Sequence, residues 1–216
     1  MISMMSQKFK IYYYKLTTDN GGAPCVKEKD GLLSLAICKP RIRSTAERGD
    51  WIFGFAANSL DQDNRLIYIA QVTEKICNGD YYRQKCFVSR ADCIYQLHGD
   101  KYVWRCGALH HGPEHLVHDL GKPPDYKNIS VLLSREFRYF GKEGTAEYKS
   151  RYRLLKQAVE GLGRGHRVNC KKALKKELMA LKEEVWKKYS KKVLGEPTRQ
   201  LEHGICHRSR SCGVLE

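Results

Sequence analysis

Short apolar runs separated by polar turns dominate the first 140 residues of the chain. The runs are rich in aromatic and β-branched side chains and end at Gly, Asp or Asn, a pattern typical of β-strands. We expect strands at residues 9–16, 51–55, 65–72, 93–97 and 101–105, and extended segments at 128–134 and 137–140. Residues 31–38 fit either a strand or a short helix, because so short a run does not reveal its period.

The C-terminal third has a different period. Apolar residues recur every three or four positions in residues 145–162 and 169–189, which predicts two amphipathic helices capped by Thr145 and Asn169. A short helix is expected within residues 108–120. Strands followed by helices indicate an α+β fold. We expect a partly open, mixed β-barrel, with the short His-bearing helix and the two C-terminal helices packed against it.

This distribution predicts a single α+β domain over residues 9–195. Its β-rich part spans residues 9–140 and its helical part spans residues 145–195. Residues 196–216 are polar and are expected to form a flexible tail. A chain of 216 residues is long enough to bury one core of this kind.

The charge of the chain points to an anionic partner. The formal net charge is +15 and the pI is about 9.4, which favours nucleic acid, a nucleotide or an acidic surface. From Arg151 onward, 17 Lys and Arg stand against 7 Asp and Glu, so the C-terminal third carries most of the excess. A solvated lysine face that only aids solubility is the alternative explanation.

The sequence also favours a cytoplasmic location. No apolar run approaches the roughly 20 residues needed to span a bilayer, and the N-terminal residues show no signal-peptide pattern. The nine cysteines are scattered without a CxxC pair, which suggests reduced thiols rather than a disulfide framework. No membrane partner is expected, and the oligomeric state stays open.

Several polar and basic residues are candidates for contacts with nucleic acid. Residues 39–43 are expected to be extended, so their alternating cations would share one side and could hold phosphates. Two further groups are the polar residues after the aromatic strand and the lysines of the last helix. A charged sheet edge or a solvated helix face would explain the cations without a ligand. The candidates are Lys39, Arg41, Arg43, Ser44, Asn58, Ser59, His110, Lys171, Lys172 and Lys175.

Histidines cluster in the expected short helix. His110, His111, His115 and His118 fall within nine positions, and Glu114 lies among them. Such a cluster could line a polar pocket, support the helix end, hold a metal or supply a general base. The pattern is not HExxH, so no metal site is expected, and no P-loop or GxGxxG indicates a cofactor. The acid–base candidates are His111, Glu114 and His115.

Four separated blocks resemble the nucleotide modification associated domain 2 family. They are GDWIFGFAANS, ALHHGPEHLVHDLG, FRYFG and YKSRYRLLKQAVEGLGRGHRVN, and the resemblance covers roughly residues 9–190. It implies a role with systems that make, read or process modified DNA bases in bacteria and phages, and it assigns no catalytic residue. The block RGDWIFGF…RLIYIAQVTE also resembles the barrel strands of PUA, ASCH and EVE domains. Some of those domains bind an unusual or flipped base beside the barrel, which implies a PUA-like core here.

These observations together favour binding of nucleic acid, with DNA preferred, that carries a modified or flipped base. In this hypothesis the cleft lies between residues 51–58 and 110–118. The basic segment would hold phosphates, and the C-terminal lysines would add non-specific attraction. Two alternatives stay open: an enzyme that acts on a nucleotide or a DNA base, and a protein-interaction module in a defence or counter-defence complex.

Overall fold

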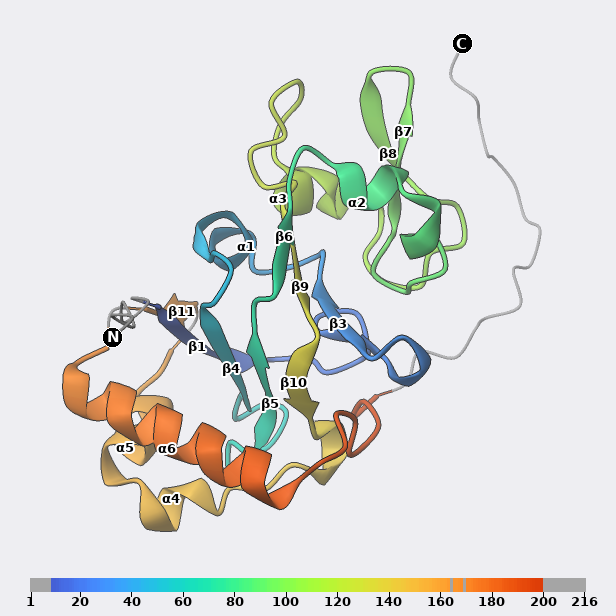
Figure 1. The fold of residues 1–216 in the computed structure, drawn as a ribbon. Coiled ribbons are helices and arrows are strands. Elements are labelled where there is room, and N and C mark those ends of the chain that lie inside the picture. The colour runs from blue at the N-terminus through green and yellow to red at the C-terminus, as the bar shows by residue number, and fades with distance from the viewer. Residues whose placement is uncertain (1–8, 164, 169, 200–216) are drawn as a thin grey trace, which may run out of the picture.

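The computed structural model describes residues 9–163, 165–168 and 170–199. These residues form an α+β fold of several sheets and helices, as the two hydrophobic periods predict (Figure 1). The largest sheet has the strand order β10 (Glu136–Tyr139), β5 (Leu66–Gln71), β4 (Trp51–Ala56), β1 (Ile11–Leu16) and β11 (His166–Arg167). β1 and β4 are parallel, and the other neighbours are antiparallel.

Helices of the C-terminal third cover one face of the large sheet (Figure 1). They are α4 (Tyr148–Arg151), α5 (Arg153–Glu160) and α6 (Lys172–Lys188). The rings of Trp51 and Phe55 pack against them, whereas Ile52 packs on the opposite face. The aromatic strand is therefore core, as its pattern predicts. Gly54 stands among these large side chains because a Cβ at that position would collide with the ring of Tyr68.

A second sheet packs on the other face of the large one, in the order β2 (Cys25–Lys27), β3 (Leu32–Leu35), β9 (Val131–Ser134) and β6 (Glu74–Ile76). A two-stranded ribbon joins the sheets, because β5 continues into β6 and β9 continues into β10, and the two strands stay paired. Within the described residues the sheets do not close into a barrel, so the expected PUA-like barrel is not confirmed.

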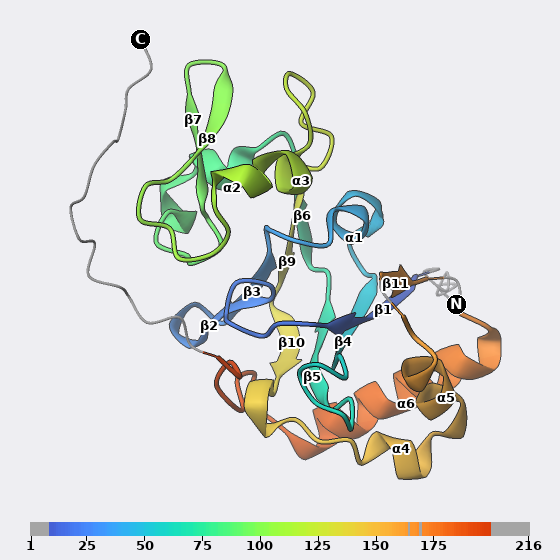
Figure 2. The same cartoon turned by 180° about the vertical axis from the view of Figure 1, so that it is seen from behind.

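A third layer covers the second sheet. It consists of α2 (Asp80–Arg83), the hairpin of β7 (Tyr95–His98) and β8 (Lys101–Trp104), and α3 (Leu116–Leu120). These elements share an apolar cluster with β3 and β9, and Figure 2 shows them beyond the second sheet from the C-terminal helices. The hairpin and the short His-bearing helix are both found near their expected places.

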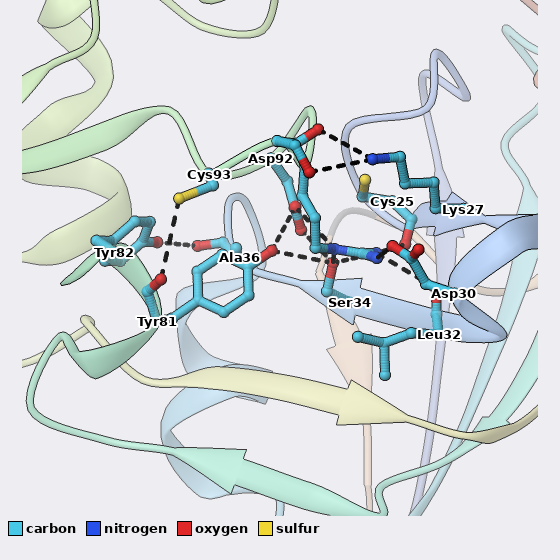
Figure 3. A network of polar contacts seen from close by, with 12 residues as sticks. Cys25, Lys27, Asp30, Leu32, Ser34, Ala36, Tyr81, Tyr82, Asp92 and Cys93 are labelled. Carbon is cyan, nitrogen blue, oxygen red and sulfur yellow. Dashed lines mark hydrogen bonds and ion pairs between the residues drawn. The ribbon is translucent and has the colours of Figure 1, made fainter. Parts of the chain in front are cut away.

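A buried polar network ties the third layer to β3 (Figure 3). Asp92 accepts hydrogen bonds from Ser34 Oγ at 2.5 Å and from the Tyr81 hydroxyl at 2.6 Å. Arg90 Nη2 donates to the carbonyl oxygen of Cys25 at 2.9 Å. Both charged groups are buried and find partners inside the protein, so the network is a structural clamp.

The basic segment differs from its prediction. It forms helix α1 (Pro40–Thr45), with Pro40 in the first turn, instead of an extended strand. Ser44 lies near the end of this helix. Proline fixes φ and lacks an N–H, so it is as well suited to start a helix as to end a strand. The local sequence alone does not choose between these roles.

The last described residues are bonded to the body of the protein. The Thr198 N–H donates to Asp19 Oδ2 at 3.0 Å, and the Arg199 N–H donates to the carbonyl oxygen of Asp19 at 3.0 Å. The rest of the expected tail, and the expected helix cap Asn169, lie outside the described residues. In the part of the chain that the structure describes, no helix has the length and apolar character to cross a membrane.

Candidate functional site

A cleft of about 770 Å³ opens where the large sheet meets α1 and α3. Four segments far apart in the sequence line it: the end of β1, the turn between β3 and α1, the histidine segment with α3, and β11 (Figure 2). The lining includes part of the basic segment and part of the histidine cluster. These predicted residues are Lys39, Arg41, His110, His111 and His118.

Three cations of the cleft, Lys39, Arg41 and Arg167, form no ion pair with a carboxylate among the described residues. The positive charge of these cations affects the pKa of His166. Burial lowers the pKa of His166, and the charges of the three cations lower it further. Lys39 also places its ammonium 4.6 Å from the centre of the Tyr14 ring. The cleft is therefore positively charged and suited to an anion.

Arg43 does not line the cleft, contrary to the sequence-based prediction. Residues two apart in an α-helix point about 200° away from each other, so Arg41 faces the cleft and Arg43 turns into the protein. Arg43 is fully buried. Its guanidinium donates at 2.5–2.8 Å to the carbonyl oxygens of Cys38, Asp119, Asn128 and Ser130. It is unavailable to a phosphate and instead joins the segments that build the cleft.

Cys38, His111 and Asp119 form a chain of hydrogen bonds at the cleft. His111 Nε2 lies 3.3 Å from Cys38 Sγ, and His111 Nδ1 lies 2.7 Å from Asp119 Oδ2. The buried Asp119 also accepts the Cys38 N–H at 2.9 Å and the Tyr95 hydroxyl at 2.8 Å. The imidazole thus stands between a thiol and a carboxylate that is itself held in place.

The electrostatics of this chain keep His111 protonated at neutral pH. Its hydrogen bonds to Asp119 and Cys38 raise the pKa of His111 to about 10, although burial acts in the opposite direction. Burial alone would raise the pKa of Asp119. The hydrogen bonds from His111, the Cys38 N–H and Tyr95 outweigh burial and hold this pKa below its usual value.

Left-handed backbone conformations gather at the cleft. Cys38, Lys39 and His111 have φ angles of 56°, 42° and 49°. For a residue other than glycine this conformation costs on the order of 1–3 kcal/mol, and such strain concentrates at active sites and ligand clamps. The hydrogen bonds of Asp119 to the Cys38 N–H and to His111 hold the two strained segments together.

His110 lines the same cleft and has an unsatisfied ring nitrogen. Only 4% of the residue is exposed, and Nδ1 has no hydrogen-bond partner among the described residues. Burial lowers the pKa of His110, so the ring is neutral at pH 7. It fits against Gly22, where a Cβ would come within 2.8 Å of the ring. A buried polar atom of this kind calls for a ligand or water partner.

Asn58 and Ser59 line a second hollow beside the cleft. Its volume is about 740 Å³, and it shares Thr17, Lys39 and Gly165 with the cleft. Lys39 therefore stands between the two hollows. The polar residues that follow the aromatic strand lie next to the cleft rather than inside it.

The expected acid–base group Glu114 is not the partner of His111. Glu114 pairs with His115 at 2.9 Å, and both side chains are exposed. The His115 ring stacks on the His111 ring with centroids 4.6 Å apart, so it contacts His111 from outside the cleft lining. Within the described residues, no group of three or more His, Cys, Asp or Glu side chains is arranged to hold a metal ion.

The remaining candidates also lie outside the cleft lining. Ser44 is exposed on α1, and its hydroxyl donates to the carbonyl oxygen of Arg41 at 3.2 Å. Lys171 and Lys172 are exposed at the start of α6. Lys175 donates to the carbonyl oxygen of Phe9 at 2.8 Å, which gives it a structural contact. A role of these lysines in long-range attraction of an anion stays a prediction.

Sequence reasoning missed Cys38, His166 and Arg167, which line the cleft, and it did not identify the buried Asp119 as the partner of His111. Cys38 and His111 are 73 positions apart, so no local motif connects them. Asp119 lies eight positions after His111, within the block that carries the histidines. The short distance in sequence between Asp119 and His111 was the available signal. The sequence alone does not show that the two side chains form a hydrogen bond.

Comparison with known proteins identifies a family. The family model described as nucleotide modification associated domain 2 matches residues 8–204 and so includes every segment that lines the cleft. No curated protein and no solved structure matches the chain.

Proposed function

The chain belongs to the nucleotide modification associated domain 2 family, and we propose that its cleft binds one nucleotide of a nucleic acid strand whose base is modified or flipped out. The family's name associates it with nucleotide modification in general. The observation that supports the finer proposal is the meeting, in one cleft, of histidine rings and of cations that form no ion pair with a described carboxylate. The cations are Lys39, Arg41 and Arg167, and the rings are His110 and His111.

The cleft suits a single nucleotide in size and chemistry. Its volume of about 770 Å³ lies within the range of about 300–1,000 Å³ that is usual for small-ligand sites. Arg41 and Arg167 can bind phosphate oxygens bidentately, and Lys39 adds a point charge. Apolar lining from Leu16 and Ile37 can face a base, while the histidine edges offer hydrogen bonds.

The second hollow favours a strand over a free nucleotide. The two hollows share Lys39, so neighbouring units of one strand could occupy them with a phosphate between. Extruding a base from a duplex costs a few kcal/mol. A strand that is already single, or a base that pairs weakly, avoids most of this cost, so we expect such substrates to bind more tightly.

Fluorescence anisotropy with single-stranded DNA oligonucleotides over a series of salt concentrations tests whether the cations of the cleft bind phosphates. Arg41→Ala should weaken binding to all sequences and reduce the slope of log K against log salt by about 0.7. Lys101→Ala is the matched control, because Lys101 is an exposed cation on β8 outside both hollows. Binding that is insensitive to salt, or equally affected by both variants, would contradict the proposal.

Oligonucleotides that differ at one central position test the base pocket. The affinities of strands with cytosine, 5-hydroxymethylcytosine or an abasic site at that position should be compared. We expect the abasic strand to bind most weakly because it leaves the cleft unfilled. His110→Phe keeps a ring of similar size but removes the nitrogens, so it should reduce the difference between base and abasic strands. Absence of affinity for any DNA or RNA would instead favour a protein-interaction module.

A further inference from the structure

Cys38 brings a thiol to the cleft, and nucleotide binding gives this thiol no role. We propose that Cys38 is the nucleophile of an acyl-transfer reaction, with His111 as the acid–base group and Asp119 as the residue that positions the imidazole. The substrate is an acyl group in amide or ester linkage on a nucleotide. This choice of substrate rests on the proposed function, whereas the nucleophile rests on geometry alone.

The three residues have the order of a nucleophile–base–carboxylate triad, which is recognised by geometry and roles rather than by sequence order. The Nε2–Sγ distance of 3.3 Å is within the looser range of such pairs before substrate binds. The 2.7 Å bond to Asp119 fixes the ring so that Nε2 meets the sulfur. Nε2 is therefore the atom that is placed to exchange a proton with the sulfur.

Two independent observations support the cleft beside this thiol as the substrate site. Cys38 and His111 both line the cleft, and both residues are held in strained left-handed conformations. The same cleft is lined by the nine-tenths buried His110, whose Nδ1 has no hydrogen-bond partner among the described residues. The cations Lys39, Arg41 and Arg167 line the cleft together with the thiol, so an anionic group of the substrate would be held near it.

The reaction balances with water as the only co-reactant. The thiolate forms a bond to the carbonyl carbon, whose π electrons move to oxygen. These electrons return as the bond to the leaving nitrogen or oxygen breaks, and the leaving group takes the proton of His111. Water then attacks the thioester carbon and gives a proton to His111, and the C–S bond breaks. The products are a carboxylic acid, the freed nucleotide and the regenerated thiolate–imidazolium pair.

Other cysteines of the chain provide internal comparisons. Burial raises the pKa of Cys25 to about 12 and that of Cys93 to about 11, so both are unreactive at neutral pH. Cys77 and Cys86 are exposed. The reaction rates of Cys77 and Cys86 therefore give the reference rate for an exposed thiol of this protein that lies outside the cleft.

Acetyl transfer is the first test. After incubation with p-nitrophenyl acetate, peptide mass spectrometry should find an acetyl group on Cys38 that hydroxylamine removes. Cys38→Ser should lose it, His111→Gln should slow its formation about 100-fold or more, and Cys86→Ser should leave it unchanged. Acetylation of Cys86 as fast as that of Cys38 would overturn the proposal.

A nucleotide substrate is the second test. N4-acetyl-2′-deoxycytidine 5′-monophosphate should be deacetylated faster than the same nucleoside, because only the nucleotide offers a phosphate to the cations of the cleft. Deacetylation that persists in Cys38→Ser would overturn the proposal. Equal rates for nucleotide and nucleoside would refute the nucleotide substrate.

Asp119→Asn tests positioning separately from structure. Without the carboxylate the pKa of His111 falls, so alkylation of Cys38 by iodoacetamide should slow about tenfold or more near pH 7 and recover above about pH 9, where an ordinary thiol ionises unaided. A purely structural role predicts no such pH-dependent recovery, and its absence would overturn the role of Asp119.

DNA affinity of the wild-type protein, measured in parallel, separates this proposal from the preceding one. Retained DNA binding without acetylation of Cys38 overturns the triad alone. Acetylation of Cys38 without any affinity for DNA or nucleotide overturns the proposed function and the nucleotide substrate, and it supports the nucleophile.

Discussion

Arg41 and Arg43 are separated by one residue and stand in opposite environments. The helical rotation at α1 turns one guanidinium to the cleft and the other into the protein. The sequence predicted both on one side because an extended chain was assumed after Pro40. Because this segment is helical rather than extended, Arg41 is a candidate ligand-binding cation and Arg43 is a structural one.

Replacing Arg43 should destabilise the fold far more than replacing Arg41. Arg43→Met removes the donors of four carbonyl hydrogen bonds and should lower the free energy of unfolding by about 3 kcal/mol or more. Arg41→Ala changes an exposed side chain and should stay within about 0.5 kcal/mol. Urea unfolding followed by tryptophan fluorescence measures both. Equal stability of the two variants would show that the buried contacts are not formed.

Arg41 should also control the titration of His166. The pKa of His166 is lowered by burial and then by the charges of Lys39, Arg41 and Arg167. Arg41→Ala removes one of these charges, so the pKa of His166 should rise towards its ordinary value of 6.5. An NMR titration of the imidazole protons measures the change, with Lys101→Ala as the control. An unchanged pKa would mean that Arg41 does not face the cleft.

At the scale of elements, local pattern predicts some features and distant contacts decide others. The strands around Trp51 and Leu66 and the long helix α6 follow from composition and period, which the chain carries locally. The expected helix 145–162 is instead divided at Tyr152 into α4 and α5. The Leu155 N–H at the start of α5 donates to Glu177 Oε2 at 2.7 Å. This contact comes from another helix, and no local pattern reveals it.

The clamp between β3 and the third layer should be a main source of stability. Asp92 is fully buried, and its loss leaves the charge of Arg90 without its buried partner. Asp92→Ala should therefore lower the free energy of unfolding by about 3–5 kcal/mol. Asp30 contacts the same guanidinium at 3.3 Å, but its side chain is 43% exposed. Asp30→Ala is the matched control and should cost about 1 kcal/mol or less in thermal denaturation. Similar losses in both variants would contradict a clamp centred on Asp92.

At the scale of the whole molecule, the cleft lies at the seam between the large sheet and the third layer. Composition alone predicted an anionic partner, and the structure places three cations at this boundary. The thiol–imidazole pair could not be predicted, because Cys38 follows β3 of the second sheet, whereas His111 lies 73 positions later in the third layer. Arg43 joins these layers through carbonyl oxygens on both sides. The stability of the fold and the geometry of the site are therefore coupled.

This coupling should make the stability of the protein depend on the ionisation of His111. In the folded state the pKa of His111 is raised from 6.5 to about 10, so folding favours the protonated ring. The contribution of the protonated His111 ring to the free energy of unfolding is complete below pH 6.5, and it is lost as the pH rises through about 10. Urea unfolding across this window should show a steeper loss of free energy for the wild-type protein than for Asp119→Asn. In that variant the hydrogen bond that raises the pKa of His111 is weakened, so the part of the pH dependence that comes from this ring should decrease. Parallel pH profiles would mean that the Asp119–His111 pair does not stabilise the folded protein.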